Sequence, residues 1–189
     1  MALKKPSSNE WLQAVLDDFD SFLLDHAACE RKASAMALTF VVRYPDREPL
    51  LDPLISLARE ELAHFQQVFR LLRSRGLEFR KDEKDPYVNA LLQQTRRGRE
   101  EELLDRLLLA GVVEARGNER FQRIADALEE PELKAFYTEI ARSEGRHAGL
   151  FVRLAKELFP PQEVDARLGF WFEREQEAIE GVAPRPALH

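Results

Sequence analysis

The sequence predicts an all-α protein built as a four-helix bundle, with a long crossover connection and extra short helices. Two patterns in the 189 residues lead to this fold class. Apolar side chains recur at spacings of three and four in every long segment, and no segment alternates apolar and polar residues for long enough to suggest a strand. Residues 77–98, between the second and third long segments, are too many for a tight hairpin and therefore predict a crossover.

Capping residues and helix breakers set the expected ends of these helices. Proline stops or opens a helix because it lacks an N–H group, and glycine commonly follows the last helical residue. The expected helices run from Ser8 or Asn9 to Tyr44, from Pro49 to Gly76, from Asp85–Pro86 to before Gly98, from Arg99 to Leu128, from Pro131 to before Pro160, and from Gln162 to Ile179. We expect one domain over residues 1–189, with a core at 9–158, a C-terminal helix at 162–179 and a loose tail at 181–189.

Composition excludes several classes of protein. The formal net charge of -6 argues against a protein that coats nucleic acid, because such proteins are usually basic, although a local basic patch remains compatible with it. A single cysteine, Cys29, excludes a disulfide scaffold. No apolar run approaches the roughly 20 residues of a membrane span, and the polar N-terminus lacks the apolar region of a signal peptide. We therefore expect a cytoplasmic location.

Each of the four long helices carries an acidic residue in the middle of its apolar face. These residues are Glu30, Glu61, Glu114 and Glu144. Burying an unpaired carboxylate costs several kcal/mol, and a whole domain is stable by only about 5–15 kcal/mol. No apolar face supplies an arginine at the same level. The sequence therefore predicts that bound metal cations neutralise the four carboxylates.

The spacing of two histidines supports the metal site. Glu61 and His64, and again Glu144 and His147, form Glu-x-x-His motifs, in which the two side chains lie on one helix face about 5–6 Å apart. The long helix before each motif carries one further acid on its apolar face, Glu30 before the first motif and Glu114 before the second. Two such helix pairs form the di-metal site of ferritin-like bundles. The predicted metal ligands are Glu30, Glu61, His64, Glu114, Glu144 and His147.

Some alternatives stay open at this point. Carboxylate and imidazole ligands suit iron or manganese, and the spacing does not separate these two metals. Glu60 lies four residues before His64 and competes with Glu61, which we prefer because it lies on the apolar face. Small residues cluster near the ligands, and they provide either space for a substrate or close helix packing. They are Ala33, Ser34, Ala37, Gly111 and Gly117.

Beyond these motifs, the chain resembles the tRNA-(2-methylthio-N6-isopentenyladenosine) hydroxylases, the MiaE-type branch of the ferritin-like di-iron superfamily. The resemblance extends over about residues 25–158. Its carriers are HAACERKAS around Glu30, LAREELAHFQQVF around Glu61 and His64, DPYVNALL after the crossover, LLLAGVVEARGNERF around Glu114, and FYTEIARSEGRHAGLF around Glu144 and His147.

The resemblance implies a non-haem di-iron monooxygenase that uses O2. It would hydroxylate the isopentenyl group of 2-methylthio-N6-isopentenyladenosine beside the tRNA anticodon. By this resemblance the six predicted ligands hold two iron ions, and no catalytic residue beyond them is implied. Two electrons would come from an external reductase or a ferredoxin-like donor, because the sequence shows no flavin or nicotinamide motif. The implied partners are thus a tRNA and an electron donor.

A tRNA partner requires basic surface. Basic residues gather around the crossover, although acids are interspersed, so a mixed solvated surface is an equal interpretation. They are Arg70, Arg73, Arg75, Arg80, Lys81, Arg96, Arg97 and Arg99. The alternative functions are another ferritin-like oxidase or peroxidase that acts on a small substrate, and an iron-binding or iron-storage protein.

Overall fold

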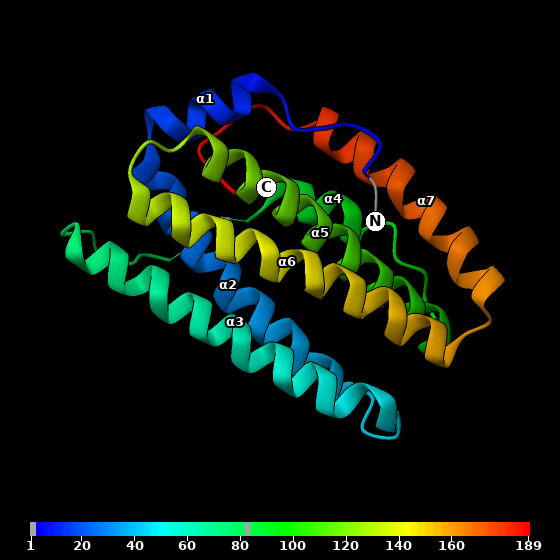
Figure 1. Ribbon diagram of the computed structural model, residues 1–189. Coiled ribbons are helices and arrows are strands. Elements are labelled where there is room, and N and C mark those ends of the chain that lie inside the picture. The colour runs from blue at the N-terminus through cyan, green and yellow to red at the C-terminus, as the bar shows by residue number, and fades with distance from the viewer. Residues whose placement is uncertain (1–2, 82–83) are drawn as a thin grey trace. The chain divides into compact units, whose positions relative to one another are not determined.

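The computed structural model describes residues 3–81 and 84–189, and this part of the chain is helical with loops between the helices (Figure 1). Its helices are α1 (Asn9–Asp17), α2 (Phe19–Arg43), α3 (Glu48–Ser74), α4 (Pro86–Leu92), α5 (Arg99–Ala127), α6 (Pro131–Leu158) and α7 (Pro161–Glu180). No strand occurs among the described residues, as the hydrophobic pattern predicts. The helices fall into two compact units, one with residues 13–81 and 185–188 and the other with residues 3–12, 84–184 and 189.

The first unit is a hairpin of the long helices α2 and α3, which lie side by side (Figure 1). Apolar side chains of both helices fill the space between them, including Phe22 and Leu23 from α2 and Leu54 and Leu72 from α3. A polar contact also joins the two helices. The Ser34 hydroxyl donates a 2.7 Å hydrogen bond to the backbone carbonyl of Ala58.

The first predicted helix is wrong in one respect, because it is two helices. The helix is interrupted at Asp18. The carboxylate of this residue accepts a hydrogen bond of 3.1 Å from the backbone N–H of Ser21 and so caps α2. The predicted end of α3 is close to the observed one. Gly76 adopts a positive φ of 73°, and the N–H of Leu77 donates to the carbonyl of Leu72, which are the features of a Schellman C-cap.

The second unit is built on a hairpin of α5 and α6, against which α7 packs. Its helix starts follow the signals in the sequence. Asp85 caps α4 by accepting a 3.1 Å hydrogen bond from the N–H of Val88, and Pro86 occupies the first position. Gly98 has a φ of 110°, which only glycine adopts without strain, and α5 begins directly after it. Pro131 opens α6.

Two buried ion pairs fasten α7 to α5. The Arg116 guanidinium and the Glu175 carboxylate are both fully buried and lie 2.8 Å apart. Asp105, also fully buried, accepts hydrogen bonds of 2.6 and 2.8 Å from Arg167 of α7 and of 2.8–3.1 Å from Arg96. Burial alone would raise the pKa of Asp105, but the hydrogen bonds from Arg167 and Arg96 hold it below its usual range.

The C-terminal segment is not the loose tail that the sequence suggests. Ala187, Leu188 and His189 are buried. In the first unit, the N–H of Leu188 donates a 2.7 Å hydrogen bond to the Asp25 carboxylate. In the second unit, the His189 ring stacks on Tyr87 with 5.1 Å between the ring centroids. Over the described ranges, no helix is both long enough and apolar enough to cross a membrane.

Replacing Asp105 with asparagine is expected to destabilise the protein by about 2 kcal/mol at neutral pH, because two guanidinium groups lose a charged acceptor. Since the folded-state pKa is lowered, Asp105 stabilises the fold above its unfolded pKa of about 3.9, and this contribution is lost as pH falls below that value. Urea denaturation of Asp105→Asn at pH 7 and pH 3 measures both effects. The exposed Asp126→Asn is the control and should change stability by less than about 0.5 kcal/mol.

Candidate metal centre

The hairpin of α2 and α3 brings three of the predicted ligands together. Glu30 comes from the middle of α2, and Glu61 and His64 come from the middle of α3, one turn apart. All three are buried, with exposed fractions of 3%, 1% and 8%. One potential ligand atom from each lies within 4.8 Å of those of the other two, which is close enough for a single cation.

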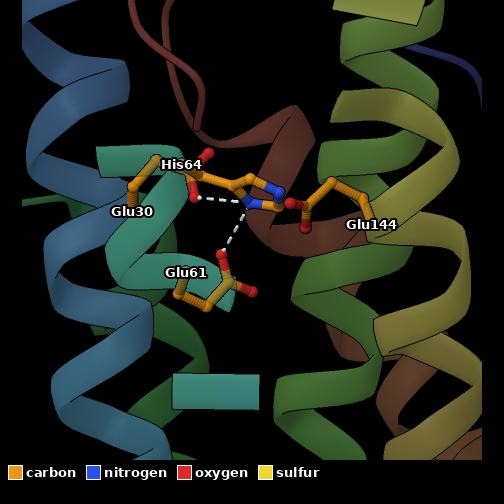
Figure 2. Close-up of side chains that lie close together, drawn as sticks. All are labelled: Glu30, Glu61, His64 and Glu144. Carbon is orange, nitrogen blue, oxygen red and sulfur yellow. Dashed lines mark hydrogen bonds and ion pairs between the residues drawn. The ribbon is translucent and has the colours of Figure 1, made fainter. Parts of the chain in front are cut away.

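The His64 ring turns its Nδ1 atom toward both carboxylates. Figure 2 shows this arrangement, in which Nδ1 lies 3.3 Å from Oε2 of Glu61 and 3.5 Å from Oε2 of Glu30. Burial alone would lower the pKa of His64, but hydrogen bonds to Glu30 and Glu61 raise it to about 10. Burial alone would raise the pKa of Glu30, whereas hydrogen bonds from His26 and His64 hold it below its usual range.

The hairpin of α5 and α6 repeats this triad. Glu114 comes from α5, and Glu144 and His147 come from α6. These three residues are also buried, and their potential ligand atoms lie within 4.8 Å of one another. The His147 ring again turns Nδ1 toward its own motif, 3.9 Å from Oε1 of Glu144. Each triad thus consists of two buried carboxylates and one imidazole.

The donor set of each triad fits a divalent transition metal. Carboxylate oxygens and imidazole nitrogen suit iron and manganese, and the absence of thiolate from the triads argues against a site of the zinc-finger kind. Arg116 is buried two residues after Glu114, yet it pairs with Glu175 and Glu119. Glu60, the competing acid, is only half-buried, whereas Glu61 is buried and belongs to the triad, as its place on the apolar face predicts.

Two polar contacts of the candidate ligands were not predicted from the sequence. His26, fully buried, lies one helical turn before Glu30, and its Nε2 is 2.7 Å from Oε1 of Glu30. Ser143 lies one turn before His147, with Oγ at 3.3 Å from Nε2 of that ring. The spacing of four residues is the signal in both cases, because residues i and i+4 share a helix face.

Comparison with known proteins identifies relatives. The family described as tRNA-(MS[2]IO[6]A)-hydroxylase (MiaE) matches residues 1–189. A tRNA 2-(methylsulfanyl)-N(6)-isopentenyladenosine(37) hydroxylase of Pseudomonas putida is 36% identical over 150 residues, which are 79% of this chain and 73% of that protein. The Salmonella typhimurium protein of the same name is 32% identical over 130 residues, which are 69% of this chain but only 47% of that protein.

A solved structure matches the fold along almost the whole chain. It is described as protein 43 with aldehyde deformylating oxygenase activity from Synechococcus. Its TM-score is 0.94 at 35% sequence identity, and the match covers 99% of this chain and 94% of that one. The predicted all-α, ferritin-like fold class is thereby confirmed. With its buried Glu and Glu-x-x-His triads and a family match over its whole length, this chain belongs to the tRNA-(MS[2]IO[6]A)-hydroxylase (MiaE) family.

Proposed function

We propose that the chain is a di-iron monooxygenase that hydroxylates the isopentenyl group of 2-methylthio-N6-isopentenyladenosine in tRNA. The observation that carries the proposal is the repeated buried triad of two carboxylates and one imidazole, in a chain of the tRNA-hydroxylase family. Both relatives are named for this substrate. A tRNA substrate also agrees with the expected cytoplasmic location.

In this proposal the six residues of the two triads hold two divalent cations. Each triad alone buries two carboxylates against a single imidazole. Two divalent cations would balance the four carboxylates, and one Glu from each of two helices with a Glu-x-x-His motif from each of the other two is the ligand set of ferritin-like di-iron proteins. The six ligands are Glu30, Glu61, His64, Glu114, Glu144 and His147. Iron is preferred to manganese because the reaction named for the relatives is a hydroxylation.

Bound iron would supply the activation of O2 that hydroxylation of a C–H bond requires. In the balanced reaction one oxygen atom enters the allylic C–H bond to give an alcohol. The other oxygen atom leaves as water, which consumes two electrons and two protons. The chain carries no flavin or nicotinamide motif, so an external reductase or ferredoxin-like protein is the proposed electron donor.

The residues of the chain bind the metal, orient its ligands and exclude water. His64 and His147 both direct Nδ1 toward the acids. An Nε2–H group on His147 can donate to the Ser143 hydroxyl, which fixes the tautomer that leaves Nδ1 as the ligand. Leu57 and Ile140 are buried one helical turn before Glu61 and Glu144, and such apolar neighbours would keep water away from the site.

The tRNA must present its modified base outside the stacked anticodon loop, because the target carbon is otherwise inaccessible. The C-terminal half of α3 offers complementary charge. Residues 62–77 include Arg70, Arg73 and Arg75 and contain no acid. Nearby, the Arg31 guanidinium lies 5.3 Å from the ring centroid of the half-buried Phe79, an arrangement that also suits stacking on a base.

Two residues of the expected basic patch form ion pairs with acidic side chains of the chain. Arg96 is bound to the buried Asp105, and Arg75 pairs with Asp20 at 2.7 Å. Charge reversal at Arg96 would therefore disturb the fold as well as any RNA contact. Arg70 and Arg73 are exposed on α3, and they provide the cleaner test.

A small-substrate oxygenase is the second candidate function. The observation that favours it is the high structural similarity to the Synechococcus protein, whose described activity is aldehyde deformylation. An iron-storage role would require a hollow assembly of many subunits, which size-exclusion chromatography detects directly.

We expect tRNA bearing the methylthio-isopentenyl nucleoside to be converted to the hydroxylated nucleoside by the iron-loaded protein with O2 and a chemical or protein reductant. Nucleoside mass spectrometry after digestion of the tRNA measures the gain of one oxygen atom. A long-chain aldehyde assayed in parallel tests the second candidate. Iron that cycles between redox states without any hydroxylated nucleoside would eliminate the tRNA function.

Glu61→Ala is expected to lower iron affinity and hydroxylation by on the order of 100-fold or more, because losing a direct ligand should cost at least as much as losing an outer hydrogen-bond partner. The matched control is Glu60→Ala, which removes the adjacent, half-buried acid. It should retain two irons per chain by elemental analysis. Equal iron loss in the two variants would contradict the ligand assignment.

Charge reversal of Arg70 and Arg73 together is expected to weaken tRNA binding and to leave the iron content unchanged. If each arginine neutralises one phosphate, the slope of log affinity against log salt should fall by about 0.7–0.9 per residue. Fluorescence anisotropy at several salt concentrations measures this slope. The double reversal of the exposed Arg142 and Arg153 on α6 makes the same change in net charge and serves as the control.

A further inference from the structure

The two oxygens of the Glu30 carboxylate have different partners. Oε1 lies 2.7 Å from Nε2 of His26, one helical turn earlier on α2. Oε2 lies 3.5 Å from Nδ1 of His64 on α3. Both Glu30 and His26 are buried, with exposed side-chain fractions of 3% and 0%. The carboxylate is therefore held from one side by its own helix and faces the metal triad with its other oxygen.

The direction of the His26 hydrogen bond follows from the chemistry of its acceptor. An ionised carboxylate has lone pairs and no proton, so it can only accept. The Nε2 atom of His26 must therefore carry the hydrogen and donate it to Oε1. A donor at 2.7 Å takes up one of the two lone pairs of Oε1 and weakens this oxygen as a ligand, whereas Oε2 lies toward His64 of the triad.

We propose that His26 is a positioning residue that reserves Oε1 of Glu30 and leaves Oε2 as the single oxygen offered to iron. This inference rests on the proposed di-iron function. His26 contributes no ligand atom to either group of closely spaced metal ligands, and its contact with the triad is the hydrogen bond to Glu30. Hydrogen bonds of this kind orient a metal ligand, and losing them typically costs 10–100-fold in metal affinity.

A purely structural role for His26 makes different predictions. The His26 ring also stacks on Phe22, with 5.8 Å between the ring centroids, so its replacement removes packing as well as a hydrogen bond. Three variants separate these contributions. His26→Leu removes both the donor and part of the packing, His26→Gln keeps an N–H near the place of Nε2, and Phe22→Leu loosens the same buried layer while it retains the His26 donor.

The experiment is an anaerobic titration of the full-length chain with Fe²⁺, followed by Mössbauer spectroscopy of the ⁵⁷Fe-loaded protein and by thermal denaturation of the metal-free protein. We expect His26→Leu to bind one of its two irons 10–100-fold more weakly and to change the quadrupole splitting of one iron. His26→Gln should restore most of the affinity and the spectrum. Phe22→Leu should lower the thermal midpoint yet bind iron as the wild type does.

Two outcomes would overturn the inference while the proposed function stands. One is a His26→Leu protein with wild-type iron affinity and an unchanged Mössbauer spectrum. The other is a His26→Gln protein that binds iron no better than His26→Leu, because a residue that acts through its N–H should be rescued by another N–H donor. A wild-type chain that takes up no Fe²⁺ would overturn the proposed function, and this inference would then fail with it.

Discussion

The structure depends on how it compensates negative charge inside an apolar interior. Glu30 and Glu61 are buried in one helical hairpin, and Glu114 and Glu144 are buried in the other. Water cannot solvate these carboxylates, so each hairpin must present positive charge or hydrogen-bond donors beside them. The histidine of each Glu-x-x-His motif provides part of this compensation.

Local signals made most of the fold predictable. The Asp85–Pro86 cap, Gly98 and Pro131 each act within a few residues, and α4, α5 and α6 begin where these signals lie. The break at Asp18 was not predictable, because the apolar periodicity continues across it and neither glycine nor proline marks it. The buried C-terminal residues were missed for a related reason: their partners, such as Asp25, are distant in sequence.

The candidate ligands were predictable because burial and spacing both leave traces in the sequence. A carboxylate on an apolar helix face is conspicuous, and a Glu-x-x-His motif fixes which acid accompanies the histidine. The ion-pair partners of arginines leave no such trace. Arg96 and Arg116 look like surface residues in the sequence, yet they bind Asp105 and Glu175, which lie on another part of the second unit. The sequence therefore predicts which basic residues gather around the crossover, but not that Arg75 and Arg96 form ion pairs with acids of the same chain.

The raised pKa of His64 has a consequence for how the α2–α3 triad would take up a cation. At neutral pH a group with a pKa of about 10 carries a proton, so the α2–α3 triad contains an internal positive charge of its own. This charge offsets part of the negative charge of Glu30 and Glu61, which the hairpin buries beside it. A cation that bound this triad through Nδ1 would have to displace the proton, so metal uptake there is expected to weaken as pH falls.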